Sequence, residues 1–156
     1  DRLKMRLRAY EIISEVLGEA RQNILTSISG EVDQLIGSYF ALITGGKYDQ
    51  VRLSRDDFSL RVFSNEKGDW INPDTEELSA GARDQLYLAA RLALMTAVIG
   101  DNYMPVILDD PLVHFDSERR ENTRKLLKEV SKKHQVLIFS CHDYYDDWAD
   151  QMIAFW

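Results

Sequence analysis

The sequence has little that would cross-link, anchor or export it. Its single cysteine, Cys141, permits no internal disulfide, which fits a reducing compartment. The longest apolar stretch, LYLAARLALMTAVIG, contains Arg91 and is shorter than the roughly 20 residues that span a bilayer. The first residues, DRLKMRLRAYE, are charged throughout and do not have the pattern of an export signal. We therefore expect a cytoplasmic chain with no membrane partner, and a start at Asp1 is compatible with a piece of a longer protein.

Positive charge is also scarce. Acidic residues outnumber basic ones by 26 to 19, which gives a net charge of −7 and a pI near 4.9. This balance excludes a surface that binds nucleic acid throughout, although a local basic patch remains compatible with it. The length of 156 residues and the hydrophobic content of 45% suit one domain with a substantial core.

Two common active-site motifs are missing. TGGK at residues 44–47 lacks the spacing of a phosphate loop, is followed by Tyr48 and precedes a strand instead of following one. A hydrolase triad of Ser79, His142 and an aspartate is disfavoured because no Gly-x-Ser-x-Gly elbow exists. The chemistry must therefore be sought in other motifs.

Residues 1–43 have a helical pattern. Apolar residues recur at spacings of three and four from Leu3 to Ile28, with Arg, Glu and Gln between them. This pattern fits an amphipathic helix or the root of a coiled coil, and Ser14 and Arg21 occupy positions where a strict heptad would place apolar residues. Gly30 is a candidate break or kink, and the pair Gly45-Gly46 is a candidate end of the helix.

The middle of the chain predicts a small antiparallel sheet. YDQVRLS and FSLRVFS alternate, so that Val51 and Leu53, and then Phe58, Leu60 and Val62, face one side. The segment NEKGDWINPDTEE that follows is rich in turn residues and predicts a loop.

The last part alternates strand and helix. A nearly all-apolar helix from Leu86 to Val98 should be buried, VILDD and QVLIFSC read as buried strands, Ser117 to Lys133 reads as a charged amphipathic helix, and MIAFW reads as a third strand. This order predicts an α/β fold with a parallel sheet and flanking helices. Ligands of such sheets bind at the carboxyl ends of the strands, where Asp109, Asp110 and His142 fall.

These three side chains suggest a site, but each also has a structural interpretation. An aspartate that ends a buried strand can reach Mg²⁺, usually through water, and a second acid directly after it can orient an attacking water. Alternatively, Asp109 and Asp110 cap the loop that Pro111 begins. His142 could contact a phosphate or be an ordinary polar loop residue.

The stretch LSAGARDQ at residues 78–85 offers a second site. A helix amino terminus presents free N–H groups, and glycine permits close backbone approach, so the start of this helix can bind an anion. Ser79 could add its hydroxyl group. The alternative is that Ser79 only caps the helix and that the small residues serve packing.

Together these segments resemble the motifs of ABC-type ATPases. LSAGARDQ resembles the signature motif, VILDD the Walker B strand, VHFD the D-loop and FSCHD the switch-histidine segment, and their order and spacing match. A long helix that enters a strand pair before the signature is similar to the SMC-like repair ATPases, in particular the YhaN-type and RecN-like proteins. The resemblance covers nearly the whole chain. It divides the chain into a coiled-coil root at residues 1–43 and the carboxyl-terminal lobe of an ATPase head at residues 44–156.

The resemblance also implies residue roles. Asp109 would serve Mg²⁺, Asp110 would position the attacking water in place of the usual Glu, and His142 would contact the γ-phosphate. Asp116 of the D-loop would communicate across a dimer of heads. The signature residues would contact ATP held by the other head of that dimer; they are Ser79, Gly81 and Gln85.

Several partners follow from the same resemblance. They are an amino-terminal lobe with the phosphate loop, a second identical head and DNA, and the isolated chain is expected to be inactive. The competing interpretations are a fragment of a transporter ATPase subunit, which the long stalk helix disfavours, and a module that binds ATP for dimerisation without hydrolysing it.

Overall fold

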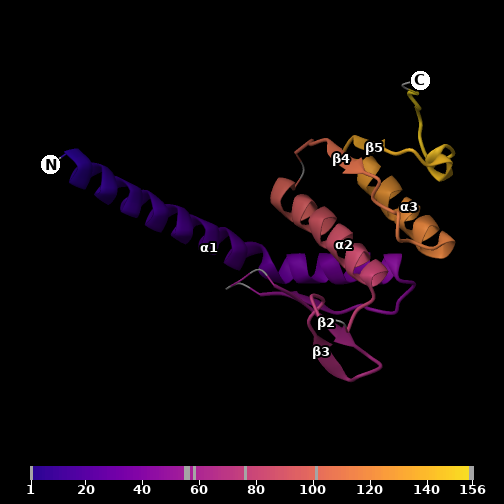
Figure 1. Cartoon of the computed structure of the whole chain (residues 1–156), viewed down its shortest axis with the longest axis horizontal. Helices are drawn as coiled ribbons and strands as arrows, with labels where there is room; N and C mark the ends of the chain where they lie inside the picture. The colour runs from indigo at the N-terminus through magenta and orange to yellow at the C-terminus, as the bar shows by residue number, and fades with distance from the viewer. Residues whose placement is uncertain (1, 55–56, 58, 76, 101, 155–156) are drawn as a thin grey trace.

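The computed structural model describes residues 2–54, 57, 59–75, 77–100 and 102–154, with only the backbone for residues 21–29. The elements follow one another in this order: helix α1 (Arg2–Ile43), strands β1 (Val51–Leu53), β2 (Leu60–Ser64) and β3 (Asp69–Ile71), helix α2 (Ala80–Ile99), strand β4 (Val106–Asp109), helix α3 (Ser117–Ser131), strand β5 (Val136–Phe139) and the 3-10 helix η1 (Asp143–Tyr145). The predicted α/β class is confirmed. Figure 1 shows α1 projecting from a lobe that gathers the other elements.

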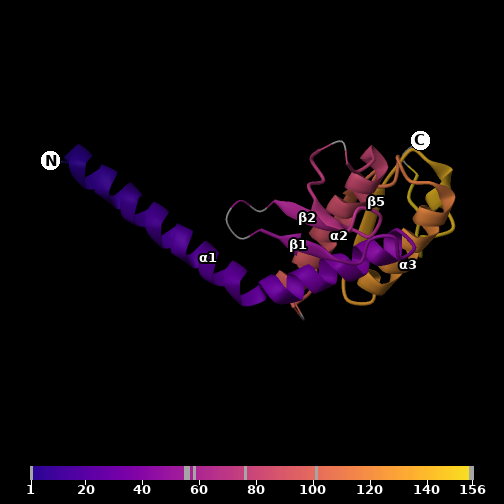
Figure 2. The ribbon, with the colours of Figure 1, turned by 90° about the horizontal axis from the view of Figure 1, so that it is seen from below.

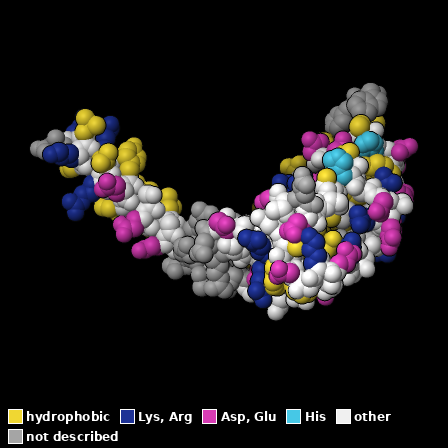
Figure 3. Space-filling model, turned by 60° about the horizontal axis from the view of Figure 1, so that its bottom comes forward, with side chains coloured by type: hydrophobic (Ala, Val, Ile, Leu, Met, Phe, Trp, Pro, Cys, Tyr) yellow, Lys and Arg dark blue, Asp and Glu magenta, His cyan; other side chains and the backbone are white. Residues whose placement is uncertain are grey.

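Helix α1 has two parts with different surroundings. Residues 2–20, which we call the stalk, are all exposed, and apolar side chains such as Leu3 at 83% and Leu17 at 64% exposure lie on it beside charged ones (Figure 3). Residues 32–43 pack in the lobe and bury four large side chains at helical spacing: Val32, Ile36, Phe40 and Ile43. The side chain of Ile28, the last apolar residue of the predicted helical pattern, lies outside the described residues.

The predicted end of α1 is confirmed. Gly45 and Gly46 adopt positive φ angles of 63° and 85°, which glycine reaches without a Cβ clash, and the N–H of Gly46 donates to the carbonyl of Ala41 at 2.8 Å. The helix is not broken at Gly30, although its two ends point in different directions (Figures 1 and 2). A glycine within a long helix costs only about 1 kcal/mol, so it weakens the helix without ending it.

The antiparallel sheet has three strands, in the order β1-β2-β3. Val51 pairs with Val62, and Val62 with Ile71, and all three side chains are buried on the inner face. The strand pair was predicted correctly, with Phe58 outside the described residues, but the prediction of a loop over 65–77 was wrong in part. Strand β3 has three residues, too few for a period-two pattern to show in the sequence.

Helix α2 lies against α1 and forms the centre of the core. Its buried side chains include Leu86, Ala89 and Ala93, as expected for a nearly all-apolar helix. Val98, predicted to be buried as well, is 65% exposed because the last turn of α2 extends past the elements that cover its middle.

Strands β4 and β5 form the predicted parallel pair, with Asp109 opposite Phe139 at its carboxyl end. The pair is buried on one face, but on the other face apolar side chains are exposed: Ile107 at 64%, Phe139 at 49% and Leu137 at 37%. The prediction of fully buried strands was therefore wrong for this chain. In the third predicted strand, MIAFW, the described residues 152–154 are not paired, and residues 155–156 lie outside the described residues.

Among the described residues, no helix combines the length and apolar character needed to cross a membrane.

Candidate functional site

The carboxyl end of β4 carries an unusual backbone. Asp110 has φ of 39° and is the one non-glycine residue with positive φ among the described residues. Its N–H donates to the carbonyl of Phe139 at 2.9 Å, so the pairing with β5 extends one residue beyond the strand. Left-handed backbone costs a non-glycine residue about 1–2 kcal/mol, and Asp is among the residues that tolerate it best. This turn separates the direction of the Asp110 side chain from that of Asp109.

Ser140 contacts both predicted catalytic residues, through the side chain of Asp110 and the backbone of His142. Its hydroxyl donates to Oδ1 of Asp110, and the same oxygen accepts the backbone N–H of His142 at 3.0 Å. The second oxygen of Asp110, Oδ2, faces the Sγ of Cys141 at 3.9 Å. Ligand atoms of Asp110, Cys141 and His142 all lie within 4.8 Å of one another, so the structure brings Asp110 and His142 together as predicted.

Asp109 is exposed beside this group. Among the described residues its side chain makes no hydrogen bond or ion pair, so both carboxylate oxygens remain available to a hydrated cation.

An aromatic cluster supports the histidine from behind. The His142 ring stacks on Tyr144 with centroids 5.0 Å apart, Tyr144 contacts Tyr145, and Tyr145 packs edge-on against Trp148. Burial raises the pKa of Tyr145 above its ordinary value, so this phenol stays neutral. Arg120 lies over the Tyr144 ring at 4.4 Å. Sequence reasoning missed this cluster, although the run YYDDW signals it.

The start of α2 has the geometry of a cap. Ser79 has extended φ and ψ, and its Oγ accepts the N–H of Ala82 at 3.2 Å. The structural interpretation of Ser79 as a helix cap is therefore confirmed. The residue is exposed, and a capping hydroxyl still has its own proton to donate to an anion.

Gly81 is required by a close approach. A Cβ at this position would lie 3.0 Å from the carbonyl oxygen of His114, tighter than most side-chain contacts. The His114 ring in turn lies 2.6 Å from Oδ2 of Asp84. The loop that leaves Asp110 therefore crosses the start of α2 and joins the two predicted motifs.

Gln85 differs from the other signature residues. It is fully buried one turn into α2, and neither polar atom of its amide has a hydrogen-bond partner among the described residues. An unpaired buried amide costs about 1–3 kcal/mol. Of the three predicted signature residues, Ser79 is exposed, Gly81 is half-buried and Gln85 is buried. The predicted contact of Gln85 with nucleotide stays a prediction.

Asp116 begins α3. Its Oδ1 accepts the N–H of Arg119 at 2.8 Å, and its Oδ2 lies 3.5 Å from the Arg119 side chain. The carboxylate thus caps the helix, and its negative charge interacts favourably with the positive end of the helix dipole. Its side chain remains largely exposed. The predicted role of Asp116 in communication across a dimer stays a prediction.

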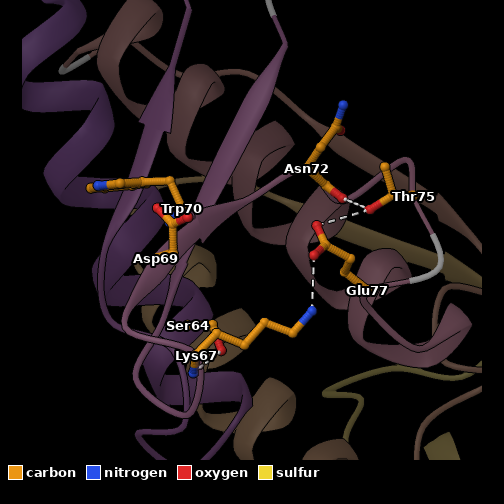
Figure 4. A network of polar contacts seen from close by, with 7 residues as sticks. All are labelled: Ser64, Lys67, Asp69, Trp70, Asn72, Thr75 and Glu77. Atoms are coloured by element: carbon orange, nitrogen blue, oxygen red, sulfur yellow. Dashed lines mark hydrogen bonds and ion pairs between the residues drawn. The ribbon is translucent and has the colours of Figure 1, made fainter.

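A polar network fixes the segment that leads into Ser79 (Figure 4). Lys67 donates to Glu77 at 2.8 Å, Thr75 donates to the same carboxylate at 3.2 Å, and the Thr75 hydroxyl also contacts the carbonyl of Asn72 at 2.6 Å. The hydrogen bond from Lys67 lowers the pKa of Glu77. The β2–β3 hairpin thereby anchors the loop that presents the start of α2.

Among the described residues, no hydrogen bond or ion pair joins Ser79 to Asp110 or His142. The loop of His114 lies between the strand-end group and the start of α2 in the sequence and approaches Gly81.

Comparisons with known proteins show which proteins resemble this chain in sequence and in fold. No family model matches the chain. The chain is 37% identical over 112 residues to YhaN of Bacillus subtilis. The matched region covers 71% of this chain and 11% of that protein. It is 32% identical over 146 residues to the DNA double-strand break repair Rad50 ATPase of Archaeoglobus fulgidus. That matched region covers 90% of this chain and 16% of the relative. A solved structure from work on ATP-driven dimerization and DNA-stimulated activation of SMC ATPases matches with a TM-score of 0.68, at 19% identity, over 85% of this chain and 81% of the solved one.

The chain is a carboxyl-terminal lobe of an SMC/Rad50-like ATPase head. The structural match shows the fold, and the sequence relatives show the family. An SMC/Rad50-like lobe accounts for the long α1 that enters the antiparallel sheet, and the relatives do not favour a transporter subunit. The lobe spans between a tenth and a sixth of the length of these relatives, so the activity of the whole protein is a matter of proposal.

Proposed function

We propose that this lobe supplies residues to ATP hydrolysis between two dimerised heads of a full-length SMC/Rad50-like protein. The observation that carries the proposal is the joint anchoring of Asp110 and His142 on Ser140 at the carboxyl end of β4 and β5. Open parallel sheets bind ligands at this edge.

The strand-end residues would divide the work. Asp109, free of protein partners in the described structure, would take one position in the hydration shell of Mg²⁺. Asp110 would accept a proton from the attacking water, and His142 would donate to the γ-phosphate. Because Asp110 is one methylene shorter than the usual Glu, its water must sit closer or hydrolysis must be slower. The left-handed backbone of Asp110 turns the carboxylate towards Ser140 and so fixes where that water would lie.

The start of α2 would act on the other head. Free N–H groups, the positive end of the helix dipole and the Ser79 hydroxyl together favour an anion such as a γ-phosphate. The lack of any described contact between this surface and the strand-end group supports action in trans.

The amino-terminal lobe would cover the exposed face of β4 and β5. Ile107, Leu137 and Phe139 form an apolar surface there, and parallel sheets are usually covered on both faces. The missing lobe would also bring the phosphate loop.

DNA is the proposed substrate of the full-length protein, since the relatives include DNA double-strand break repair ATPases. Within the lobe, Arg52 and Arg61 lie directly opposite each other on the outer face of the antiparallel sheet, and Arg52 stacks on Trp70 at 4.1 Å. Two facing like charges are unfavourable alone, and a phosphate backbone would relieve them.

Substitution of Asp110 in the full-length protein tests the proposal. Asp110→Asn keeps the shape and removes the charge, so hydrolysis should fall by roughly 10²–10⁴-fold, as for the loss of a positioned general base. ATP binding should survive, because Asp109 still serves the metal, and the heads should accumulate as an ATP-bound dimer. Asp150→Asn, an exposed aspartate outside the site, is the matched control.

Unchanged turnover in Asp110→Asn, or loss of nucleotide binding, would contradict the role of this residue. Arg52→Glu and Arg61→Glu test the DNA surface separately. Each should weaken DNA binding and reduce its salt dependence, whereas Arg91→Glu on α2 should not.

A further inference from the structure

We propose that Asp110, Cys141 and His142 form a binding site for a soft divalent cation of the Zn²⁺ type, distinct from the Mg²⁺ position at Asp109. The three residues offer one carboxylate oxygen, one sulfur and one imidazole nitrogen. Cys141 lies within the FSCHD segment, but the proposed ATPase chemistry gives it no role.

The spacing of the ligand atoms suits such an ion. Zinc lies about 2.0–2.3 Å from carboxylate, imidazole and thiolate ligands in a tetrahedral arrangement, which places the ligand atoms about 3.3–3.8 Å apart. In the structure the Cys141 Sγ is 3.9 Å from Oδ2 of Asp110, and all three ligand atoms lie within 4.8 Å. Closure around the ion needs side-chain movements of about 1 Å or less.

The surrounding hydrogen bonds pre-organise the site. Ser140 donates to Oδ1 of Asp110 and leaves Oδ2, the oxygen that faces Cys141, as the ligand. The same Ser140 oxygen accepts the N–H of His142, so the loop that carries Cys141 and His142 is held to the carboxylate. Outer contacts of this kind orient metal ligands in known sites. Stacking on Tyr144 further restricts the His142 ring.

The donor set selects the class of metal. Mg²⁺ prefers six oxygen ligands, whereas thiolate and imidazole favour Zn²⁺ and similar ions. A bound Zn²⁺ would replace the proton of the thiol, which is released to solvent, and would offset the negative charges of the resulting thiolate and of the carboxylate. Cys141 and His142 are exposed, so the ion has an entry path and a fourth position for water.

Occupation of this site would inhibit hydrolysis, a consequence that rests on the proposed function. The ion would hold the carboxylate of Asp110 and the ring of His142, which could then no longer orient water or contact phosphate. Zinc would thus compete with the catalytic arrangement without displacing Mg²⁺ from Asp109.

Cobalt titration of the 156-residue chain tests the site itself. Co²⁺ substitutes for Zn²⁺ and gives a sulfur-to-metal absorption band only when a thiolate binds it. We expect one Co²⁺ per chain, with that band, displaced by Zn²⁺ but not by excess Mg²⁺. Cys141→Ser should abolish the band, and Asp110→Asn and His142→Gln should each weaken binding. Loss of the outer contact in Ser140→Ala should weaken it by about 10–100-fold.

His114→Asn is the matched control, because His114 and Asp84 form an exposed pair outside the proposed site. Circular dichroism of every variant shows whether the fold is kept. Binding without the sulfur band, or binding that His114→Asn weakens as much as His142→Gln, would overturn the proposal.

A second measurement separates this proposal from the proposed function. In the full-length protein, Zn²⁺ should inhibit ATP hydrolysis, and Cys141→Ser should lower the fractional inhibition by Zn²⁺ when each variant is compared with its own zinc-free turnover. If Co²⁺ binds as expected but Zn²⁺ leaves turnover unchanged, the metal site stands and the assigned role of Asp110 and His142 fails.

Discussion

The two sheets of this lobe differ in how completely the chain covers them. The antiparallel sheet buries Val62 and Ile71 on its inner face and presents Arg52 and Arg61 on its outer face, so its own alternation satisfies both sides. The parallel pair is apolar on both faces, yet Ile107 and Phe139 remain exposed on one of them. A parallel sheet that carries apolar residues on both faces is usually covered by other elements on both faces. The parallel pair, which also carries the candidate site, is therefore the part of the lobe that keeps one apolar face exposed.

The largest expected effect concerns ATP binding and hydrolysis by this chain alone. This chain alone should hydrolyse no ATP and bind it only weakly, because it lacks the lysine and amide cradle of a phosphate loop. Calorimetry and a turnover assay on the 156-residue chain check this. Micromolar binding would show that the parallel pair is already a complete nucleotide site.

Two matched isoleucines test the comparison through stability. Ile71→Ala, at a position 4% exposed, should lower the free energy of unfolding by about 2–5 kcal/mol. Ile107→Ala, at a position 64% exposed, should change it by less than about 0.5 kcal/mol in this chain. Urea unfolding measures both. Equal losses would mean that the parallel pair is covered in solution.

Self-association should follow from the same exposed face. Ile107 and Leu137 are opposite each other in the parallel register, and we expect the chain to associate as its concentration rises. The double variant Ile107→Ser and Leu137→Ser should sediment as a smaller species at the same concentration. A wild-type chain that stays monomeric at high concentration would contradict this expectation.

The amino-terminal caps of α2 and α3 should contribute about equally to the free energy of unfolding. Ser79→Ala at the start of α2 and Asp116→Ala at the start of α3 should each cost about 1 kcal/mol in urea unfolding. Ser38→Ala, on an exposed position of α1, is the control. In the full-length protein, Ser79→Ala should also reduce ATP hydrolysis, whereas an equal effect from Ser38→Ala would argue against a special role of Ser79.

The smallest expected effect is a pH dependence in the β1–β2 hairpin. Hydrogen bonds from the Ser54 hydroxyl and from the N–H and hydroxyl of Ser59 lower the pKa of Asp57 from 3.8 to about 2. Because the folded pKa is depressed, its stabilisation is present above pH 3.8 and is lost as pH falls through about 2. Asp57→Asn should therefore reduce the change in urea midpoint between pH 4.5 and pH 2, and Asp150→Asn should not.

Much of the fold could be predicted because its signals are local. The end of α1 at Gly45, the strand pair around Val51 and Val62, and the alternation of β4, α3 and β5 each depend on short patterns of apolar, glycine and turn residues. Strand β3 could not be predicted, because it is too short to show a period. The apolar runs of β4 and β5 predicted buried strands, and only the family resemblance implies that one face of the parallel pair is exposed and apolar.

The candidate site was predicted in position but not in detail. Strand ends located Asp109, Asp110 and His142, because parallel strands align their carboxyl ends. The anchoring role of Ser140 could not be read from the sequence, because it depends on the turn at Asp110 that brings two distant segments within hydrogen-bond distance.

The sequence by itself determined the three long helices, the order of β1, β2, β4 and β5, the candidate cap at Ser79, and the family resemblance of four ordered motifs. These depend on neighbouring residues, and neighbouring residues are fixed by the chain. Tertiary structure alone decided that Gln85 is buried without a partner, that Gly81 lies beneath the His114 carbonyl, and that Asp110, Cys141 and His142 share one small space. Those contacts join residues about 30 or more positions apart, and only the packing of α2, β4 and β5 brings them within a few ångströms.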